Sequence, residues 1–495
     1  MPEHTQILPD LWRFDDTCAV YLIKQGGRAI AIDFGSGNWL DQLPALGVKH
    51  LDHVLITHLH ADQCGGLLDK KEWPFPLHIP AGQASWPPPP WLGAGCPTNY
   101  EPPQGQLPRA VQDLAGNCHF LWQGRRVRCM DTPGHTPNAV TVIVDHAGQQ
   151  AVFCGDAAQA GATIHQPFHL EWDHWTGTGA LTAWEGVRRL MNIDIGLLCP
   201  SHGPVIAENP RRMLRQLADK LLAFYHAKGQ ISPGEPDRYV PVEIAACGAS
   251  KISEHLYQYG GNGYLLLSGS GEALVIDPTM GDMPALEALL AELGGPRPTA
   301  CVVSHYHYDH CDAIPYLRGK YGTTAWLHPL IAEPWRDPPS SFLPWLLPEA
   351  IAADELWPER GEWHWNEYVF QVAPWQGQTW GHCVFMTRVD GKRVMFAGDS
   401  FTPTSKWNGT GGFCAYNNSR FREGFIPSAQ LALEWKPQIM AAGHNNTYYY
   451  AVSKLRKIMK WAARAEAAVR ALCPSGDLEQ DYYVVHDMVA GQVKR

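Results

Sequence analysis

The 495-residue sequence predicts an α/β (α+β) protein built as two tandem domains, each a layered sandwich of strands and helices. Three observations predict this fold class. A pattern of metal-ligand residues occurs twice in the same order, strand-like runs stand at matching places in both copies, and several ligands directly follow such a run. We expect the first domain over residues 1–230 and the second over residues 240–495, with the linker at residues 229–241, where glycine and proline are frequent.

The repeated pattern starts with a His-x-His-x-Asp run and continues with three single ligand positions further along the chain. Its first copy comprises His58, His60, Asp62, His135, Asp156 and His202, and its second comprises His305, His307, Asp309, His310, His382, Asp399 and His444. Equivalent positions are 247 (58 to 305, 135 to 382), 243 (156 to 399) and 242 (202 to 444) residues apart. So constant a shift indicates the duplication of one domain. The copies differ where Gln63 stands in place of His310.

Apolar runs of strand length place these ligands within the expected fold. Each copy opens with two such runs around a glycine turn, which is typical of a β-hairpin. These runs cover residues 19–23 and 29–33 in the first copy, and residues 264–267 and 273–277 in the second. Later runs end directly before a ligand or one residue ahead of it, at residues 54–57, 151–154, 300–304 and 394–397. Helix-like segments close the copies at residues 211–228 and 451–472. Ligands at strand ends predict a site along one edge of each sandwich.

Composition narrows the class of protein. The net charge of −10 argues against a nucleic-acid-binding protein, which usually carries an excess of basic residues. Thirteen cysteines without a C-x-x-C pair indicate a reducing compartment. The sequence shows no basic-then-apolar segment at residues 1–16 and no run of about 18 uncharged apolar residues. We therefore expect a cytoplasmic protein with a small-molecule substrate and no membrane partner; a homo-oligomer is left open.

The second copy contains the ligands for two metal ions. Two histidines at i and i+2 on an extended segment point to the same side, so His305 and His307 can reach one ion, with His382 completing its set. Asp309, His310 and His444 can reach a second ion. The carboxylate of Asp399 has two oxygens and is placed to bridge the two ions. Each ion then has three protein ligands and a bridge, which leaves room for solvent, as in catalytic zinc sites.

Such a pair of ions favours hydrolysis. Two cations about 3.5–4 Å apart lower the pKa of a water between them, and the resulting hydroxide can attack a carbonyl. Asp309 is the candidate catalytic residue, because its carboxylate can orient that nucleophile. We expect two zinc ions in the second domain, although iron accepts the same imidazole and carboxylate ligands.

The first copy lacks one imidazole. An amide oxygen binds zinc less well than an imidazole does, so Gln63 is at best a weak ligand. One ion, a weakened pair of ions, or a retired site kept for structure are the alternatives. We favour a site that still binds one or two ions, because the other ligands of this copy are all retained.

The motifs resemble those of the metallo-β-lactamase superfamily over almost the whole chain. The His-x-His-x-Asp-His run carries the resemblance, and the runs at residues 131–135 (Asp-Thr-Pro-Gly-His) and 201–204 (Ser-His-Gly-Pro) resemble the hydrolase branch that includes glyoxalase II-like thioesterases and lactonases. The resemblance implies two αβ/βα sandwiches, a dinuclear site with the ligand sets given above, and a supporting role for the acidic residues Asp33 and Asp277 at the ends of early strands.

Two departures from the family pattern bear on the reaction. β-Lactamases of the three-histidine type commonly carry cysteine or serine where this chain has Asp156 and Asp399, so β-lactam hydrolysis is disfavoured. Trp380 replaces the proline that usually precedes Gly-His, which changes the wall beside the first ion of the second domain.

These observations predict a binuclear metal-dependent hydrolase of ester, lactone or thioester bonds, with the second domain as the main catalytic unit. An oxygen-activating diiron enzyme on the same fold is the alternative. In a third interpretation the first domain is a structural or partner-binding module.

Several other residues are weaker candidates. Lys406, Arg420 and Arg422 follow Asp399 and could hold a substrate carboxylate or phosphate, with solvated surface charges as the alternative. His165, His169 and His174 could replace the missing ligand of the first copy, although their spacing matches no motif. Two insertions, at residues 82–108 and 333–365, are either lids over the sites or packing surfaces.

Overall fold

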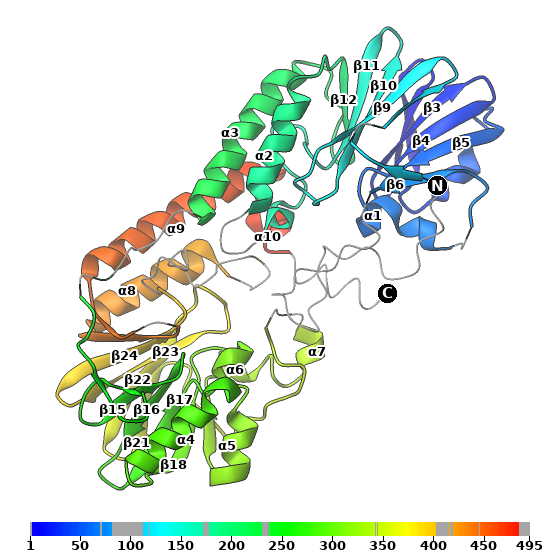
Figure 1. Ribbon diagram of the computed structural model, residues 1–495. Coiled ribbons are helices and arrows are strands. Elements are labelled where there is room, and N and C mark those ends of the chain that lie inside the picture. The colour runs from blue at the N-terminus through cyan, green and yellow to red at the C-terminus, as the bar shows by residue number, and fades with distance from the viewer. Residues whose placement is uncertain are drawn as a thin grey trace.

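The computed structural model describes residues 2–69, 72–81, 112–116, 118–171, 178–229, 236, 238–341, 343, 345–401, 415, 419–444 and 446–484. Figure 1 shows two sandwiches, one from each half of the chain, joined through a layer of long helices. The insertion at residues 82–108, His174, Lys406 and most of the expected linker lie outside the described residues. Among those described, no helix is long and apolar enough to cross a membrane.

The first sandwich consists of a seven-stranded sheet, in the order β1 to β7, and a five-stranded sheet, in the order β12-β11-β10-β9-β8. The strands of the larger sheet are β1 (Glu3–Leu8), β2 (Leu11–Asp15), β3 (Ala19–Gln25), β4 (Arg28–Ile32), β5 (His50–Leu55), β6 (Leu77–Pro80) and β7 (Gln112–Leu114). Those of the smaller sheet are β8 (His119–Trp122), β9 (Arg125–Asp131), β10 (Val140–His146), β11 (Gln149–Gly155) and β12 (Leu197–Pro200). The helices are α1 (Ala61–Cys64), α2 (Thr178–Leu190) and α3 (Pro210–Gly229), with 3-10 turns η1 (Asn38–Gln42), η2 (Gly65–Asp69) and η5 (Pro167–Leu170).

The second sandwich repeats this plan with an eight-stranded and a six-stranded sheet. The larger sheet contains β13 (Glu243–Ile244), β14 (Ser250–Lys251), β15 (Leu256–Tyr259), β16 (Gly263–Leu267), β17 (Glu272–Ile276), β18 (Arg297–Val302), β19 (Thr324–Leu327) and β20 (Glu355–Leu356). The smaller contains β21 (Gly361–Trp365), β22 (Tyr368–Pro374), β23 (Cys383–Val389), β24 (Lys392–Gly398), β25 (Ile439–Ala442) and β26 (Tyr448–Tyr449).

Its helices are α4 (Met283–Glu292), α5 (Ile314–Tyr321), α6 (Pro329–Ala332), α7 (Pro338–Ser341), α8 (Ile426–Trp435), α9 (Val452–Leu472) and α10 (Leu478–Asp481). Short turns η6 (Met280–Asp282) and η7 (Tyr308–His310) and a π-helical turn η9 (Phe421–Phe425) complete the set.

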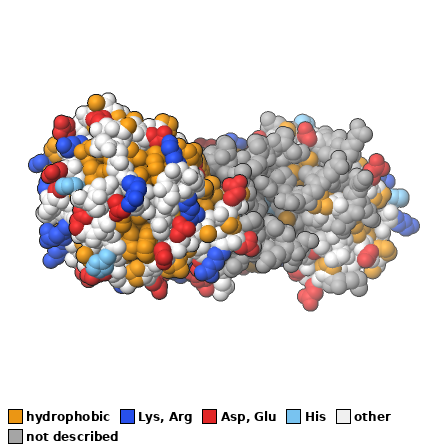
Figure 2. All heavy atoms as spheres, turned by 90° about the horizontal axis from the view of Figure 1, so that it is seen from below, with side chains coloured by type: hydrophobic (Ala, Val, Ile, Leu, Met, Phe, Trp, Pro, Cys, Tyr) orange, Lys and Arg blue, Asp and Glu red, His pale blue; other side chains and the backbone are white. Residues whose placement is uncertain are grey.

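Figure 2 shows acidic, basic and hydrophobic side chains interspersed over this sandwich on the face seen from below.

Burial explains the layers. β3 and β4 carry apolar side chains on both faces, so one face packs against the smaller sheet and the other against the helical turns outside. The parallel pair β4–β5 and the parallel pair β11–β12 both end at the same edge of the sandwich. The second half repeats these pairs as β17–β18 and β24–β25. The expected strands therefore lead into the ligand segments of both halves, and the mixed α/β sandwich is confirmed twice.

The two sandwiches share one hydrophobic core at their junction. α2 and α3 cover the outer face of the five-stranded sheet, and α8 and α9 cover the six-stranded sheet; their buried side chains form one continuous cluster. α3 lies beside α9 (Figure 1), where the Trp461 indole N–H donates to the carbonyl of Ala227. At the centre of the junction Lys228 and Glu171 form a buried ion pair of 2.7 Å, and the Tyr482 hydroxyl donates to Glu171.

The tryptophan-rich insertion at residues 333–365 serves mostly as core. Trp335, Trp357, Trp363 and Trp365 are buried in the hydrophobic cluster of the second sandwich. Trp345 differs, because its ring packs against His307 at a centroid distance of 5.1 Å. This insertion therefore combines a packing surface with one side chain at the candidate site.

Candidate metal centres

Three histidines of the first half converge at the strand-end edge of its sandwich. His58 follows β5, His60 precedes α1, and His135 lies between β9 and β10. Each offers a ring nitrogen, and these atoms all lie within 4.8 Å of one another. Thr57 Oγ1 lies 3.1 Å from His58 Nδ1, which leaves Nε2 facing the site. The Nε2 atoms of His58 and His60 are buried without a hydrogen-bond partner, which is rare in proteins and fits a metal-ligating imidazole.

Asp156 lies between this histidine group and a second group. Its Oδ2 is 3.4 Å from His135 Nε2 and 3.6 Å from His58 Nε2, whereas its Oδ1 is 2.9 Å from His202 Nδ1. His202 Nε2 is 3.2 Å from Asp62 Oδ2. The two carboxylate oxygens of Asp156 thus face opposite groups, the placement that a bridging ligand needs.

The structure adds His165 to the second group of the first half. The ligand atoms of Asp62, Asp156, His165 and His202 all lie within 4.8 Å of one another. The ring of His165 stacks on that of His202 with centroids 3.5 Å apart and planes 7° apart. His169, the next histidine along, packs against His60 and His135 at centroid distances of 4.3 and 4.6 Å. Spacing alone gave no signal for His165, because no family motif covers it.

Gln63 points its side chain at Asp62. Its amide nitrogen donates to Asp62 Oδ2 at 3.0 Å, and its backbone carbonyl accepts from the amides of Phe34 and Gly35, both at 2.9 Å. The side chain is fully buried, and its amide oxygen has no hydrogen-bond partner. A role for Gln63 as a weak ligand stays a prediction.

In the second half, two overlapping groups share His310. His305, His310 and Asp399 form one, and Asp309, His310 and His444 form the other, each with ligand atoms within 4.8 Å. Asp399 Oδ1 lies 3.3 Å from His310 Nε2, and its Oδ2 lies 3.3 Å from His444 Nε2. Asp309 Oδ2 lies 3.0 Å from His444 Nε2. Asp399 therefore has the same central position as Asp156.

His307 and His382 lie beside His305 but belong to neither group. The ring of His382 is nearly parallel to that of His305, at 4.8 Å and 9°, and its Nδ1 lies 3.0 Å from the carbonyl of Cys383. His307 Nδ1 lies 3.3 Å from the side-chain nitrogen of Gln378. The structure thus brings the three histidines into contact in the second half and converges their ring nitrogens only in the first. Their part in metal binding stays a prediction.

The charges of the two centres suit cations. Burial alone would raise the pKa of Asp309, but His310 and His444 outweigh it and lower that pKa to about 2, so the carboxylate is ionised at neutral pH. Burial lowers the pKa of His60 and of His382 to about 3, which keeps both imidazoles neutral, as metal ligands must be. Burial would also lower the pKa of His444, yet Asp399 and Asp309 raise it to about 9. Protons and metal ions therefore compete for His444.

A buried aspartate contacts the ligand-bearing segments of each centre, and its hydrogen-bond partners differ between the two halves. Asp33 accepts from the Thr57 amide and hydroxyl, both at 2.8 Å, and from the Ser201 hydroxyl at 2.7 Å. Asp277 accepts from the Ser304 amide at 2.6 Å and hydroxyl at 2.8 Å.

The third partner of Asp277 is an imidazole, because His310 Nδ1 lies 3.1 Å from Oδ2. The residue equivalent to Ser201 is Gly443. A Cβ at Gly443 would lie 2.3 Å from Asp399 Oδ1 and 2.7 Å from His310 Cε1. His310 therefore requires a glycine at position 443. The first half, which has Gln63 in place of His310, has Ser201 in place of that glycine.

The family model described as the metallo-beta-lactamase superfamily matches residues 13–202 and again residues 256–444. This chain belongs to the metallo-beta-lactamase superfamily. The two matches also confirm that its fold is duplicated in tandem.

Relatives within the superfamily include thioesterases. The chain is 28% identical over 199 residues to an atrochrysone carboxyl ACP thioesterase of Aspergillus chevalieri, a match that covers 39% of this chain and 53% of that protein. It is 25% identical over 282 residues to thioesterase pkgB of Emericella nidulans, which covers 56% of this chain and 68% of that protein. The chain thus spans about half the length of most curated relatives it matches.

The solved structures that this chain matches include metallo-β-lactamases. A metallo-β-lactamase of Cronobacter sakazakii is 17% identical with a TM-score of 0.32 and aligns over 46% of this chain and 87% of its own. A metallo-beta-lactamase family protein of Thermus thermophilus is 17% identical with a TM-score of 0.36, over 45% of this chain and 83% of its own.

The basic residues after Asp399 have partners in the C-terminal segment. The guanidinium of Arg420 pairs with Glu479 and lies 4.1 Å from the ring centroid of Tyr483. Arg422 lies 4.0 Å from Glu466, with more than half of its side chain exposed. A substrate-binding role for either residue stays a prediction.

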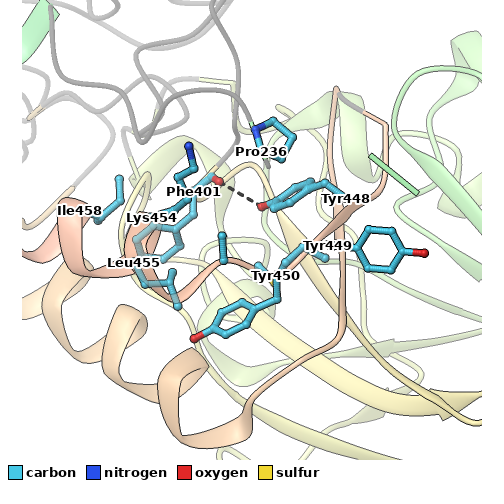
Figure 3. A pocket seen from close by; sticks show the side chains of 10 residues that line it. Pro236, Phe401, Tyr448, Tyr449, Tyr450, Lys454, Leu455 and Ile458 are labelled. Carbon is cyan, nitrogen blue, oxygen red and sulfur yellow. Dashed lines mark hydrogen bonds between the residues drawn. The ribbon is translucent and has the colours of Figure 1, made fainter. Parts of the chain in front are cut away.

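The three tyrosines after His444 contribute to a pocket whose lining includes none of the proposed metal ligands. Together with Phe401, Leu455 and Ile458 they line a narrow apolar pocket between β25 and α9 (Figure 3). The hydroxyl of Tyr448 donates to the carbonyl of Phe401 at 3.2 Å. This bond holds Phe401, two residues after Asp399, at the edge of the pocket.

Proposed function

We propose that the chain is a metal-dependent hydrolase of thioester or related ester bonds, with the second half as its main catalytic unit. The observation that carries this proposal is the second-half group in which Asp309, His310 and His444 surround Asp399. The thioesterase names of the relatives support hydrolysis, and nothing in the comparisons supports the oxygen-activating iron alternative.

The residues at this centre fit a pair of divalent ions. Two carboxylates and two imidazoles converge there, and buried ring nitrogens of His305 and His382 have no hydrogen-bond partner. We propose zinc, held by His305, His307, His382 and Asp399 at one position and by Asp309, His310, His444 and Asp399 at the other. Ions held there would polarise a carbonyl and lower the pKa of water.

Asp309 is the proposed catalytic residue because it is both ionised and reachable. Its side chain is about one-third exposed (31%), in contrast to the buried Asp399 beside it. The low pKa of Asp309 leaves its carboxylate able to accept a hydrogen bond from a water molecule at neutral pH. A water oriented in this way can attack the carbonyl carbon of a substrate.

Asn262 positions this carboxylate. Its amide nitrogen donates to the backbone carbonyl of Asp309 at 2.9 Å and to Oδ2 at 3.3 Å. Its amide oxygen accepts from the backbone amide of His444 at 2.9 Å. Asn262 therefore ties two ligand segments together, a role for which the sequence pattern gave no signal.

The proposed substrate is an acyl group carried as a thioester on a small thiol or a carrier protein, which follows the names of the relatives. A reducing, cytoplasmic setting fits the described cysteines, all of which are free thiols.

Hydrolysis of a small acyl thioester by the zinc-loaded protein tests the proposal. Asp309→Ala should lower kcat/KM by about 10²–10⁴-fold, the range for loss of a general acid–base group. Asp219→Ala, at an exposed position of α3, is the control and should retain wild-type turnover. Full activity of Asp309→Ala at unchanged zinc content would refute the mechanism.

A further inference from the structure

The first half lacks the imidazole that His310 supplies in the second half, yet its second group still contains two imidazoles. In the second half the donors around this position are Asp309, Asp399, His310 and His444. In the first half they are Asp62, Asp156, His165 and His202. Both sets contain two carboxylates and two imidazoles, although His165 comes from a different segment than His310 does.

Gln63 supplies no imidazole to this arrangement. Its amide nitrogen donates to Asp62, and its buried amide oxygen, which has no hydrogen-bond partner, is a weaker zinc ligand than an imidazole. The hydroxyl of Ser201 takes over the contact with the supporting aspartate that His310 makes in the other half. The segment that supplies His310 in the second half therefore supplies no imidazole in the first, and the second imidazole beside His202 comes from His165.

We propose that His165 is a metal ligand that replaces the missing imidazole and completes a two-ion centre in the first half. Its ring lies against that of His202, and its ligand atom lies within 4.8 Å of those of Asp62 and Asp156. A set of two imidazoles and two carboxylates suits zinc. The inference concerns metal binding and holds whichever reaction the second half catalyses.

The segment that carries His165 is held in place by other elements. The amide of Ile164 donates to the carbonyl of Leu472 at 2.9 Å, at the end of α9 in the other half. Lys220 of α3 donates to the carbonyls of Gly161 and Ala162 at 3.0 and 2.7 Å. Residues 159 and 163 form a short antiparallel bridge. His165 is therefore presented by a fixed backbone, as a ligand residue should be.

This placement links the first-half ion to the junction of the two sandwiches. Ile164 is buried in the shared core, and Glu171 at the end of the same segment pairs with Lys228 and Tyr482. An ion bound by His165 would thus stabilise the segment on which α9 and α10 rest. Loading of the first half should raise the thermal stability of the full chain.

The test is zinc content per chain at buffered free zinc, measured together with the Tm. We expect His165→Ala to lose one ion and to require at least about 10–100-fold more free zinc to regain it, since even outer partners of metal ligands have effects of that size. Its Tm should fall in zinc and match that of the wild type after chelation. His50→Ala, at an exposed position of β5, is the control and should bind as many ions as the wild type.

A second background tests whether His165 replaces the missing imidazole. In a chain with Gln63→His and Ser201→Gly, the first half regains the His310 and Gly443 pattern, so adding His165→Ala should leave the zinc content unchanged. His165→Cys should restore zinc binding through a thiolate in the original background. Wild-type zinc affinity in His165→Ala, an equal loss in both backgrounds, or failure of His165→Cys to bind zinc would each overturn the proposal.

Discussion

In the first half the buried Asp33 accepts a hydrogen bond from the Ser201 hydroxyl, whereas in the second half the equivalent Asp277 contacts the imidazole of His310. The difference shows that a ligand and a neighbouring backbone position have changed together. Considered alone, Gln63 indicates a damaged site. Considered with Ser201 and His165, it indicates a rearranged site in which the supporting aspartate and the donor set are both preserved.

The three-histidine groups also differ between the halves, and here the half with the incomplete motif has the more closely convergent ring nitrogens. In the first half the ring nitrogens of His58, His60 and His135 converge, although this half has the incomplete motif. In the second half His382 stacks on His305, and Gln378 and Trp345 contact His307. A complete ligand motif therefore does not by itself fix how closely the ligands approach one another.

The junction offers the largest expected change in stability. Lys228→Met would leave the carboxylate of Glu171 buried beside an apolar side chain, and breaking a buried ion pair in this way costs about 3–5 kcal/mol. Chemical denaturation should show that loss. If the halves instead unfold separately, one of two transitions will move and the shared-core description of the molecule fails. Lys49→Met, at an exposed position of the first sandwich, is the control.

Ser201 and Gly443 occupy equivalent positions in the two halves, and we expect a substitution at Gly443 to reduce zinc binding and turnover more than one at Ser201. Gly443→Ala would force its methyl group against Asp399 and His310, so we expect zinc binding and thioesterase turnover to fall by about 10–100-fold. Turnover and zinc content together check this. Unchanged zinc affinity in Gly443→Ala would mean that the two positions are not coupled.

The reciprocal change in the first half should be milder. Ser201→Ala removes one hydrogen bond to the buried Asp33 and should lower the free energy of unfolding by about 1–3 kcal/mol. Thiol donors are poor, so Ser201→Cys should recover little of that loss. Denaturation with zinc present measures both variants, and a value within 0.3 kcal/mol of wild type, roughly the level of additivity errors, would contradict the role of Ser201.

The smallest effect is expected at Arg420 in the second half. Its guanidinium is occupied by Glu479 and Tyr483, so Arg420→Ala should change KM for a thioester by no more than about twofold, the scale of weak surface pairs. A tenfold rise in KM with unchanged kcat would instead establish a substrate contact.

Much of this architecture could be predicted from the sequence because periodicity and spacing are local properties. The strands before His58, His305, Asp156 and Asp399 follow from short apolar runs, and the constant offset reveals the duplication. The position of His165 could not be predicted, because it depends on contacts of its segment with Lys220 and Leu472, far away in the sequence.

The remaining differences have the same physical origin. The ring of His382 stacks on that of His305 from another segment, and the support of Asp309 comes from Asn262 on a distant hairpin. Likewise, the junction of the two halves depends on Glu171, Lys228 and Tyr482, which lie in three separate segments. Spacing within a motif carries no information on such contacts.

Zinc content and turnover of Asp399→Ala and Asp156→Ala, prepared without added metal, test most directly whether both halves hold ions while the second performs most of the catalysis. We predict that Asp399→Ala loses the second-half ions and nearly all turnover, whereas Asp156→Ala loses the first-half ions, has a lower Tm and keeps the larger share of turnover. Wild-type protein without bound metal, or an Asp399→Ala variant as active as Asp156→Ala, would contradict the account.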